Sequence, residues 1–228
     1  MRISKKQYTL IIGCVTLMIV LAAAIWFAQD RLLPYRWLPV IRAFEKEDCD
    51  HPPPAGATLF VGSSSIRRWD TLAEDFPLLH VIKRGFGGAK LLDLIVYARR
   101  IIIPYQPRQI VIYAGDNDIS SDKRPETVYA NFVELVTLIR EELPAASIFF
   151  LAIKPSPQRW HKAEAMRQAN SLIRQYTQPR ENVTFVDIFS PMLGLDQTPR
   201  PELYHKDGLH LSGAGYAVWT EVLTPHLK

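Results

Sequence analysis

The sequence predicts an α/β fold in three layers, in which a parallel sheet of five strands is covered by helices on both faces. Two observations predict this class. Five short, continuous runs of apolar residues recur along the chain, and such runs are typical of strands buried on both faces. Segments with an apolar residue at every third or fourth position separate these runs, which is the spacing of one helix face. Strands that alternate with helices form a parallel sheet, because each helix returns the chain to the edge where the strands begin.

The expected strands and helices follow one another in order from residue 58 onwards. The five strands are expected at residues 58–62, 80–85, 109–115, 147–155 and 183–189. Apolar stripes mark four helices, and their members are Leu91, Leu94, Ile95 and Ala98; Val128, Phe132, Leu135 and Ile139; Met166, Ala169, Ile173 and Tyr176; and Trp219, Val222 and Leu223. The second helix is bounded by Pro125 and Pro144, since proline is tolerated in a first helical turn and ends a helix elsewhere.

An uncharged apolar segment precedes this pattern. Residues 9–28 carry no charge and follow a basic tail, residues 1–8. About twenty apolar residues suffice for a helix to cross the hydrocarbon core of a bilayer. The segment is therefore predicted to be a single-pass signal anchor. A cleaved signal peptide with a cleavage site near Ala22 and Ala24, or a lipoprotein acylated on Cys14, are the alternatives.

The charges around this segment bear on its orientation. Arg31, Arg36 and Arg42 follow it, so positive charge flanks both ends and the positive-inside bias is weak. A short basic tail before a first span usually stays in the cytoplasm, which favours a domain on the periplasmic or extracytoplasmic side of the membrane. A domain that faces the cytoplasm is the alternative. Cys49 has no partner outside the apolar segment, so no internal disulfide is implied.

A linker is expected between the apolar segment and the domain, at residues 29–56. Its apolar residues share one face of a short helix, and two interpretations stay open: the face lies at the membrane interface, or it packs on the domain. These residues are Trp37, Leu38, Ile41 and Phe44. Three successive prolines, residues 52–54, form a stiff spacer at the end of the linker. The globular domain is expected to comprise residues 57–228.

The net charge argues against a nucleic-acid partner. The formal net charge is +4. The basic tail contributes +3 through Arg2, Lys5 and Lys6, which leaves +1 for the rest of the chain. A nearly neutral domain lacks the basic surface that phosphate binding requires.

Polar and glycine-rich turns follow the expected strands. "GSSS" (62–65) follows the first strand, "RGFGG" (84–88) the second and "GDND" (115–118) the third, and "DGLHLSGAGY" (207–216) leads into the last helix. Because the carboxyl ends of parallel strands share one edge of the sheet, where ligands bind in such folds, these turns are expected to form one site.

Two familiar motifs do not fit these turns. The nucleophile elbow G-x-S-x-G requires a glycine where Ile66 stands. The glycines at residues 85–88 lack the G-x-G-x-x-G spacing of a dinucleotide loop.

A serine nucleophile needs a base and an orienting carboxylate. Of the six histidines, His205 and His210 flank Asp207. Asp207 and His210 are three residues apart across a turn that contains Gly208, which can bring carboxylate and imidazole side by side. His210 is therefore preferred as the base. The other histidines are expected to be structural or at the surface, and they are His51, His80, His161 and His226.

The four turns together resemble the SGNH (GDSL-type) hydrolases, over residues 58–227. The first block of that family, G-D-S-L, corresponds to "GSSS", with Ser63 in place of the aspartate and Ser65 in place of the leucine. The later blocks correspond to "RGFGG", "GDND" (G-x-N-D) and "DGLH" (D-x-x-H). The resemblance implies a flavodoxin-like SGNH hydrolase fold. It also implies site residues, which are Ser64 as nucleophile, Gly88 and Asn117 as oxyanion donors, and Asp207 and His210 as the remaining members of a triad.

This resemblance implies a serine esterase that works through an acyl-enzyme on Ser64, without a metal or an organic cofactor. The backbone N–H of Ser64 is expected to join Gly88 and Asn117 in the oxyanion hole. The substrate is expected to be a small-molecule, lipid or glycan ester. An O-acetyl hydrolase or transferase on envelope polysaccharide, a lysophospholipase or thioesterase, and a non-catalytic ligand-binding member of the fold stay open. Lys154, Pro155 and Pro157 are expected to shape the acyl or leaving-group side.

Overall fold

The computed structural model describes residues 13, 15–18 and 33–227. The predicted signal anchor, residues 9–28, lies outside these residues except for the helical positions 13 and 15–18. Within the described part of the chain, no helix combines the length and the apolar character needed to cross a membrane. The chain divides into two compact units, Met1–Pro39 and Val40–Lys228, and the second contains the sheet.

The sheet has the predicted five parallel strands. They are β1 (Thr58–Gly62), β2 (Val81–Gly85), β3 (Gln109–Tyr113), β4 (Ser147–Leu151) and β5 (Val183–Val186), in the spatial order β2-β1-β3-β4-β5. Every residue of β1 and β3 is buried, as the continuous apolar runs predicted. The last three strands end earlier than expected, because residues 114–115, 152–155 and 187–189 turn away from the sheet to form the loops at its carboxyl edge.

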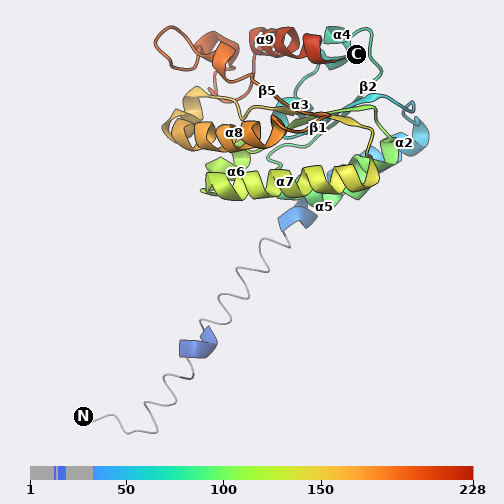
Figure 1. The fold of residues 1–228 in the computed structure, drawn as a ribbon, viewed down its shortest axis with the longest axis horizontal. Coiled ribbons are helices and arrows are strands. Elements are labelled where there is room, and N and C mark those ends of the chain that lie inside the picture. The colour runs from blue at the N-terminus through green and yellow to red at the C-terminus, as the bar shows by residue number, and fades with distance from the viewer. Residues whose placement is uncertain (1–12, 14, 19–32, 228) are drawn as a thin grey trace. The chain divides into compact units, whose positions relative to one another are not determined.

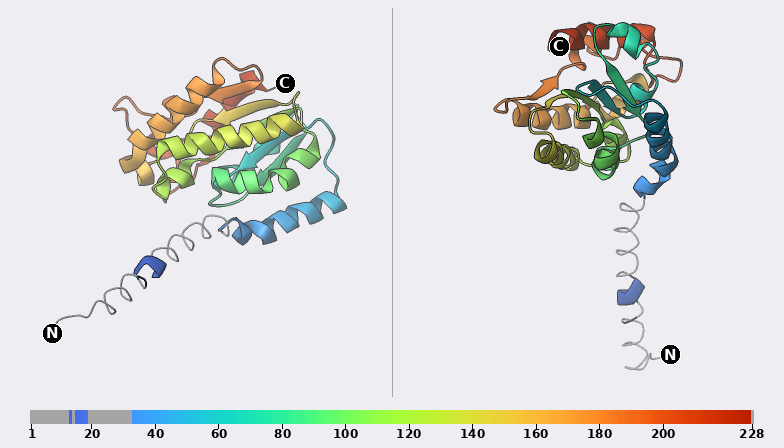
Figure 2. Two further views of the ribbon diagram at one scale, coloured as in Figure 1. Left: turned by 60° about the horizontal axis from the view of Figure 1, so that its bottom comes forward. Right: turned by 90° about the vertical axis from the view of Figure 1, so that its right-hand side faces the viewer.

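Helices cover both faces of the sheet, so the predicted three-layer fold is confirmed. Figure 1 shows α9 and α4 on one face and α5, α7 and α8 on the other, and Figure 2 shows the same layers from two further directions. The longer helices are α2 (Leu38–Asp50), α5 (Leu91–Ile101), α7 (Pro125–Glu142), α8 (Ala163–Thr177) and α9 (Gly213–Leu223). Three short helices sit at or near the strand ends, and they are α3 (Ser64–Arg67), α4 (Leu72–Asp75) and α6 (Asp116–Ser120).

Aromatic side chains fill the layer between the sheet and α9. Trp69 and Trp219, both fully buried, meet edge to face with ring centroids 5.8 Å apart. Tyr216 stacks on Trp69 at 5.1 Å, and Phe60 of β1 contacts Trp69 at 5.8 Å. This cluster ties α9 to the segment that follows β1, although about 150 residues separate them in the sequence.

The second unit includes most of α2, which packs on the domain. Ile41 is fully buried. The Arg84 side chain, only 8% exposed, forms ion pairs with Asp48 and Glu47. Arg100 forms a bidentate pair with Glu45, at 2.6 and 2.7 Å. For Ile41, which belongs to the second unit, packing on the domain is therefore observed.

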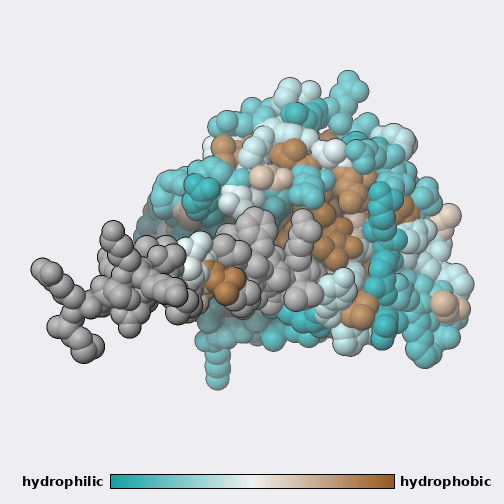
Figure 3. All heavy atoms as spheres, turned by 90° about the horizontal axis from the view of Figure 1, so that it is seen from below, coloured by the Kyte–Doolittle hydropathy of each residue, from teal (hydrophilic) through white to brown (hydrophobic). Residues whose placement is uncertain are grey.

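The surface on the side of α5 and α7 is mixed. Seen from below (Figure 3), most of the described surface is polar, and hydrophobic residues gather toward the centre of this face. One of the exposed apolar side chains in the second unit is Val96 of α5, which is 48% exposed.

Candidate active site

The turns after β1, β2 and β3 meet at the carboxyl edge of the sheet. Gly62 pairs in register with Gly85 on one side and with Tyr113 on the other. The Ser63 N–H donates to the Tyr113 carbonyl at 2.9 Å, and the Phe86 N–H donates to the Gly62 carbonyl at 2.9 Å. A Cβ on Gly62 would lie 2.0 Å from the Tyr113 carbonyl oxygen, so only glycine allows this close approach.

The three successive serines differ in burial. Ser63 is fully buried, and its Oγ lies 3.5 Å from Asp116 Oδ1. Ser65 is 2% exposed, and its carbonyl accepts a hydrogen bond from Tyr216 Oη at 2.9 Å. Ser64, the first residue of α3, is partly exposed. Of the three, Ser64 is therefore the one that a substrate can reach.

The turn after β2 places a glycine beside the turn after β3. Gly88 has φ +79°, a left-handed conformation that favours glycine. The next residue, Ala89, accepts a hydrogen bond from Asn117 Nδ2 at 3.1 Å through its carbonyl oxygen. The Asn117 amide is thus held against the Gly88 turn.

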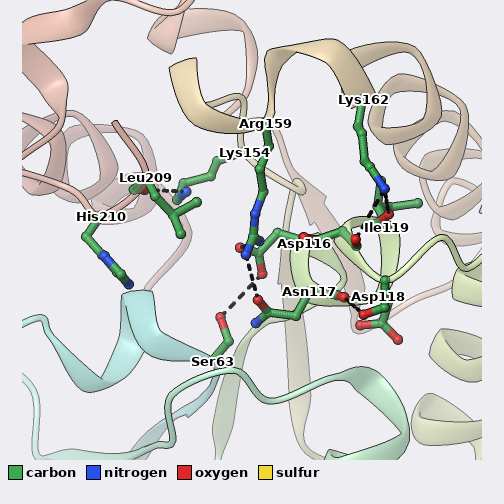
Figure 4. A network of polar contacts seen from close by, with 12 residues as sticks. Ser63, Asp116, Asn117, Asp118, Ile119, Lys154, Arg159, Lys162, Leu209 and His210 are labelled. Carbon is green, nitrogen blue, oxygen red and sulfur yellow. Dashed lines mark hydrogen bonds and ion pairs between the residues drawn. The ribbon is translucent and has the colours of Figure 1, made fainter. Parts of the chain in front are cut away.

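The turn after β3 carries two buried acids on either side of Asn117 (Figure 4). Asp116 forms an ion pair with Arg159, with Nη1 2.8 Å from Oδ2. Asp118 accepts a hydrogen bond from the Leu91 N–H at 3.2 Å, and burial raises its pKa to about 7. The two acids therefore have different roles: Asp116 neutralises a cation, and Asp118 holds the start of α5.

Asp207 and His210 form a direct pair. Asp207 Oδ2 lies 2.6 Å from His210 Nδ1, and Oδ1 accepts the N–H groups of Leu209 and His210 at 2.9 and 3.0 Å. The hydrogen bond from His210 holds the pKa of the Asp207 carboxyl well below its usual range. Gly208 has φ +64°, which permits the tight turn. Because Nδ1 is engaged by the carboxylate, Nε2 is the ring nitrogen left to take a proton.

The histidine turn lies close to the serine turn. Tyr216 follows His210 at the start of α9 and donates to the carbonyl of Ser65, which joins the two segments. In Figure 4 the His210 ring points toward the ribbon of α3. The exposed His205 contributes only backbone here: its N–H donates to the His210 carbonyl at 2.8 Å.

The loop after β4 contacts the backbone of the turn that holds Asp207 and His210. Lys154 is 1% exposed, and its Nζ donates to the Leu209 carbonyl at 2.8 Å. Burial lowers the pKa of Lys154 to about 8. The Gln158 N–H donates to the Gly208 carbonyl at 3.0 Å. The sequence predicts that Lys154 shapes the acyl or leaving-group side. The side chain is instead buried and holds the backbone of the histidine turn.

One residue of this network, Arg159, was not found from the sequence. It lies in the 3₁₀ segment Pro157–Lys162, outside every motif. Its Nη2 donates to Asn117 Oδ1 at 3.1 Å, in addition to the ion pair with Asp116. Only the position of the segment after β4 could have suggested a role.

Two further features of the described residues concern ligands. A cavity of about 480 Å³ lies between the end of α2 and the outer edge of β2, and none of the predicted site residues lines it. Within the described part of the chain, no cluster of three or more His, Cys, Asp or Glu residues is arranged to hold a metal ion.

Comparison with known proteins gives both a family and a fold. The GDSL-like lipase/acylhydrolase family matches residues 55–218. No curated protein matches the chain.

Three of the similar solved structures show how far the likeness of the fold extends. A candidate platelet activating factor from Streptococcus pneumonia is 22% identical with a TM-score of 0.75, covering 91% of this chain and 99% of that chain. A GDSL-like lipase from Bacteroides thetaiotaomicron is 22% identical with a TM-score of 0.69, covering 82% and 96%. A catalytic mutant of an acetylxylan esterase from Geobacillus stearothermophilus, with a serine replaced by alanine, is 16% identical with a TM-score of 0.63, covering 75% and 94%.

Proposed function

Because this chain belongs to the GDSL-like lipase/acylhydrolase family and is a hydrolase of ester bonds, we propose the following mechanism for it. In this mechanism Ser64 attacks the ester carbonyl and forms an acyl-enzyme. His210 Nε2 accepts the Ser64 proton, and Asp207 holds the imidazole in the required tautomer and orientation. The observation that carries the proposal is the Asp207–His210 pair at 2.6 Å, joined through Tyr216 to the turn that holds Ser64.

In this proposal, three hydrogen-bond donors from three different turns form the oxyanion hole. They are the backbone N–H groups of Ser64 and Gly88 and the side-chain amide of Asn117. The bond from Asn117 to Ala89 supports this assignment, since it holds the amide beside Gly88. Donors fixed before the reaction stabilise the negative charge as it develops, and one such donor is worth about 10²–10³ in rate.

The second half of the reaction reverses these roles. His210 gives its proton to the leaving alcohol oxygen as the C–O bond breaks. It then accepts a proton from a water molecule that attacks the acyl carbonyl, and returns it to Ser64 as the acyl–enzyme bond breaks. The products are the alcohol and the carboxylic acid. Each step uses only residues of this chain and water.

The proposal is tested by single alanine variants within the serine triplet. Ser64→Ala is expected to abolish hydrolysis of p-nitrophenyl acetate and labelling by a fluorophosphonate probe, while the thermal midpoint stays near that of the wild type. Ser65→Ala is the matched control, since Ser65 is the buried neighbour, and it is expected to keep most of the activity. Undiminished turnover by Ser64→Ala would refute the assignment.

The same experiments separate the alternative functions. A ligand-binding member of the fold without catalytic activity would not react with the fluorophosphonate. One of the similar solved structures is named an acetylxylan esterase. A panel of esters of increasing acyl length distinguishes an acetyl esterase of this kind from a lysophospholipase or thioesterase. Transfer of the acetyl group to a sugar acceptor in place of water would identify a transferase.

We also propose that residues 9–28 anchor the enzyme in the membrane, with the catalytic domain on the extracytoplasmic side. The support is the uncharged apolar run of twenty residues and the basic tail before it. An anchor would hold the site close to esters of the envelope or the bilayer.

A further inference from the structure

Arg159 reaches the site from the loop after β4. Figure 4 shows its side chain extending from the segment Pro157–Lys162 toward Asp116 and Asn117. One terminal nitrogen binds Asp116 Oδ2 at 2.8 Å, and the other binds Asn117 Oδ1 at 3.1 Å. One guanidinium thus contacts two successive residues of the same turn.

The two contacts of the Asn117 side chain fix which way its amide points. Its oxygen accepts from Arg159, and its nitrogen donates to the Ala89 carbonyl at 3.1 Å. If the amide were rotated by half a turn, its nitrogen would face the guanidinium, which has only donors, and its oxygen would face a carbonyl, which only accepts. Both contacts would then be lost. One amide hydrogen is used by Ala89, and among the described residues no acceptor is bonded to the second.

Arg159 is itself held in place. Its side chain is 14% exposed, and that of its partner Asp116 is 4% exposed. A planar guanidinium offers two nitrogens at a fixed separation, which suits two neighbouring acceptors, whereas a lysine ammonium is a single point of charge. The match between donor and acceptors therefore depends on arginine.

We propose that Arg159 is a positioning residue, which holds the Asn117 amide with its free N–H directed at the oxyanion. This inference rests on the proposed oxyanion role of Asn117. The positive charge on Arg159 also polarises the amide through its oxygen, which makes the opposite N–H a stronger donor. Arg159 acts through Asn117 and does not touch the reacting atoms.

A purely structural role for Arg159 would be to brace α6 against the loop after β4. Lys162 does this from the same segment: its Nζ donates to the Ile119 and Ser120 carbonyls at 3.1 and 3.2 Å and binds Asp122 at 2.6 Å. Lys162 contacts the far end of α6 and not the side chain of Asn117. It is therefore the matched control.

The test is a double-mutant cycle on the full chain, with kcat and KM measured for p-nitrophenyl acetate. Asn117→Ala is expected to lower kcat by about 10²–10³. Arg159→Met is expected to lower kcat by at least about 10-fold, but not by more than Asn117→Ala does. Its KM is expected to stay within about twofold of the wild-type value. The double variant is expected to match Asn117→Ala within about twofold, because the guanidinium then has no amide to orient. Lys162→Met is expected to keep the wild-type kcat.

Other results would overturn the inference. If the losses from Arg159→Met and Asn117→Ala multiply, or if Lys162→Met loses as much as Arg159→Met, Arg159 acts by another route. If Asn117→Ala keeps full kcat, the oxyanion role fails and the inference fails with it, whereas the nucleophile is judged separately by Ser64→Ala.

A second variant, Arg159→Lys, keeps the positive charge and protects the test in case the methionine variant misfolds. It is expected to restore only part of kcat.

Discussion

At the scale of single residues, three aspartates near the candidate site have three different surroundings. Asp207 is held charged by its contact with His210, with its pKa well below the usual range. Asp116 is buried but faces the cation of Arg159. Asp118 is buried without such a partner, and burial raises its pKa to about 7. Three side chains of one chemical type thus bind an imidazole ring, pair with a cation and accept a backbone N–H.

The state of Asp118 leads to a pH-dependent prediction for stability. Because its pKa rises from 3.8 to about 7 on folding, the folded chain binds this proton more tightly than the unfolded chain. The resulting stabilisation is complete below about pH 4 and is lost as the pH rises through 7. Asp118→Asn, which is always neutral and can still accept from Leu91, lacks this dependence. The free energy of unfolding of the wild type, relative to Asp118→Asn, is expected to fall between about pH 4 and pH 7 and to stay level above that.

Urea denaturation of both proteins across this range measures the difference directly. Titrating groups that do not interact with Asp118 contribute equally to both proteins and cancel. A difference that stays constant with pH would contradict a raised pKa at Asp118.

At the scale of elements, α2 behaves as part of the domain. Its acidic side chains neutralise Arg84 and Arg100, which lie on β2 and α5. Arg84 is buried, and a buried cation without its partner is strongly unfavourable. The helix therefore stabilises the outer edge strand of the sheet as well as covering it.

Two aspartates on α2 allow this idea to be tested. Asp48 binds Arg84 and also accepts from Tyr105 Oη at 2.6 Å. Asp48→Asn is expected to lower the free energy of unfolding by about 1–3 kcal/mol, because Arg84 stays buried with less neutralising charge. Asp50 pairs with Lys46 on the exposed side of the same helix. Asp50→Asn is expected to change stability by less than about 0.5 kcal/mol.

Chemical denaturation of the two variants and the wild type gives the comparison. Equal effects at the two positions would mean that the Asp48–Arg84 pair contributes no more to stability than an exposed ion pair.

At the scale of the whole molecule, the strand order places the site. The chain passes from β1 to β2 on one side and then adds β3 on the other side of β1. The direction of winding reverses between β1 and β3, and such a reversal opens a crevice at the carboxyl edge of the sheet. Ser63 binds the Tyr113 carbonyl across this point, and Ser64 follows it.

The proposed placement of the domain outside the cytoplasm is tested through its cysteines. Cys49 is exposed at the end of α2, and the only other cysteine, Cys14, lies in the predicted anchor. A maleimide that does not cross membranes is expected to label Cys49 in intact spheroplasts, and Cys49→Ser is expected to remove the label. Labelling of Cys49 only after lysis would place the domain in the cytoplasm.

The sequence by itself determined the sheet, its parallel direction and the four turns at its edge. Continuous apolar strands such as residues 58–62 can be stable only when covered on both faces, and glycines at positions 62, 88 and 208 permit turns that other residues resist. The assignment of the triad and oxyanion residues, which rests on sequence motifs, stays a prediction. Strands and turns of this kind can be predicted from the sequence because their physical cause lies within a few neighbouring residues.

The tertiary structure alone decided which serine of the triplet is partly exposed, where α2 packs and what Lys154 and Arg159 contact. Ser63, Ser64 and Ser65 are identical in type, and their burial depends on β3 and α9, far away in the sequence. Arg159 belongs to no motif and finds Asn117 only because the loops after β3 and β4 meet in space. A charge or hydroxyl takes its role from the groups it faces, and these are set by packing between distant segments.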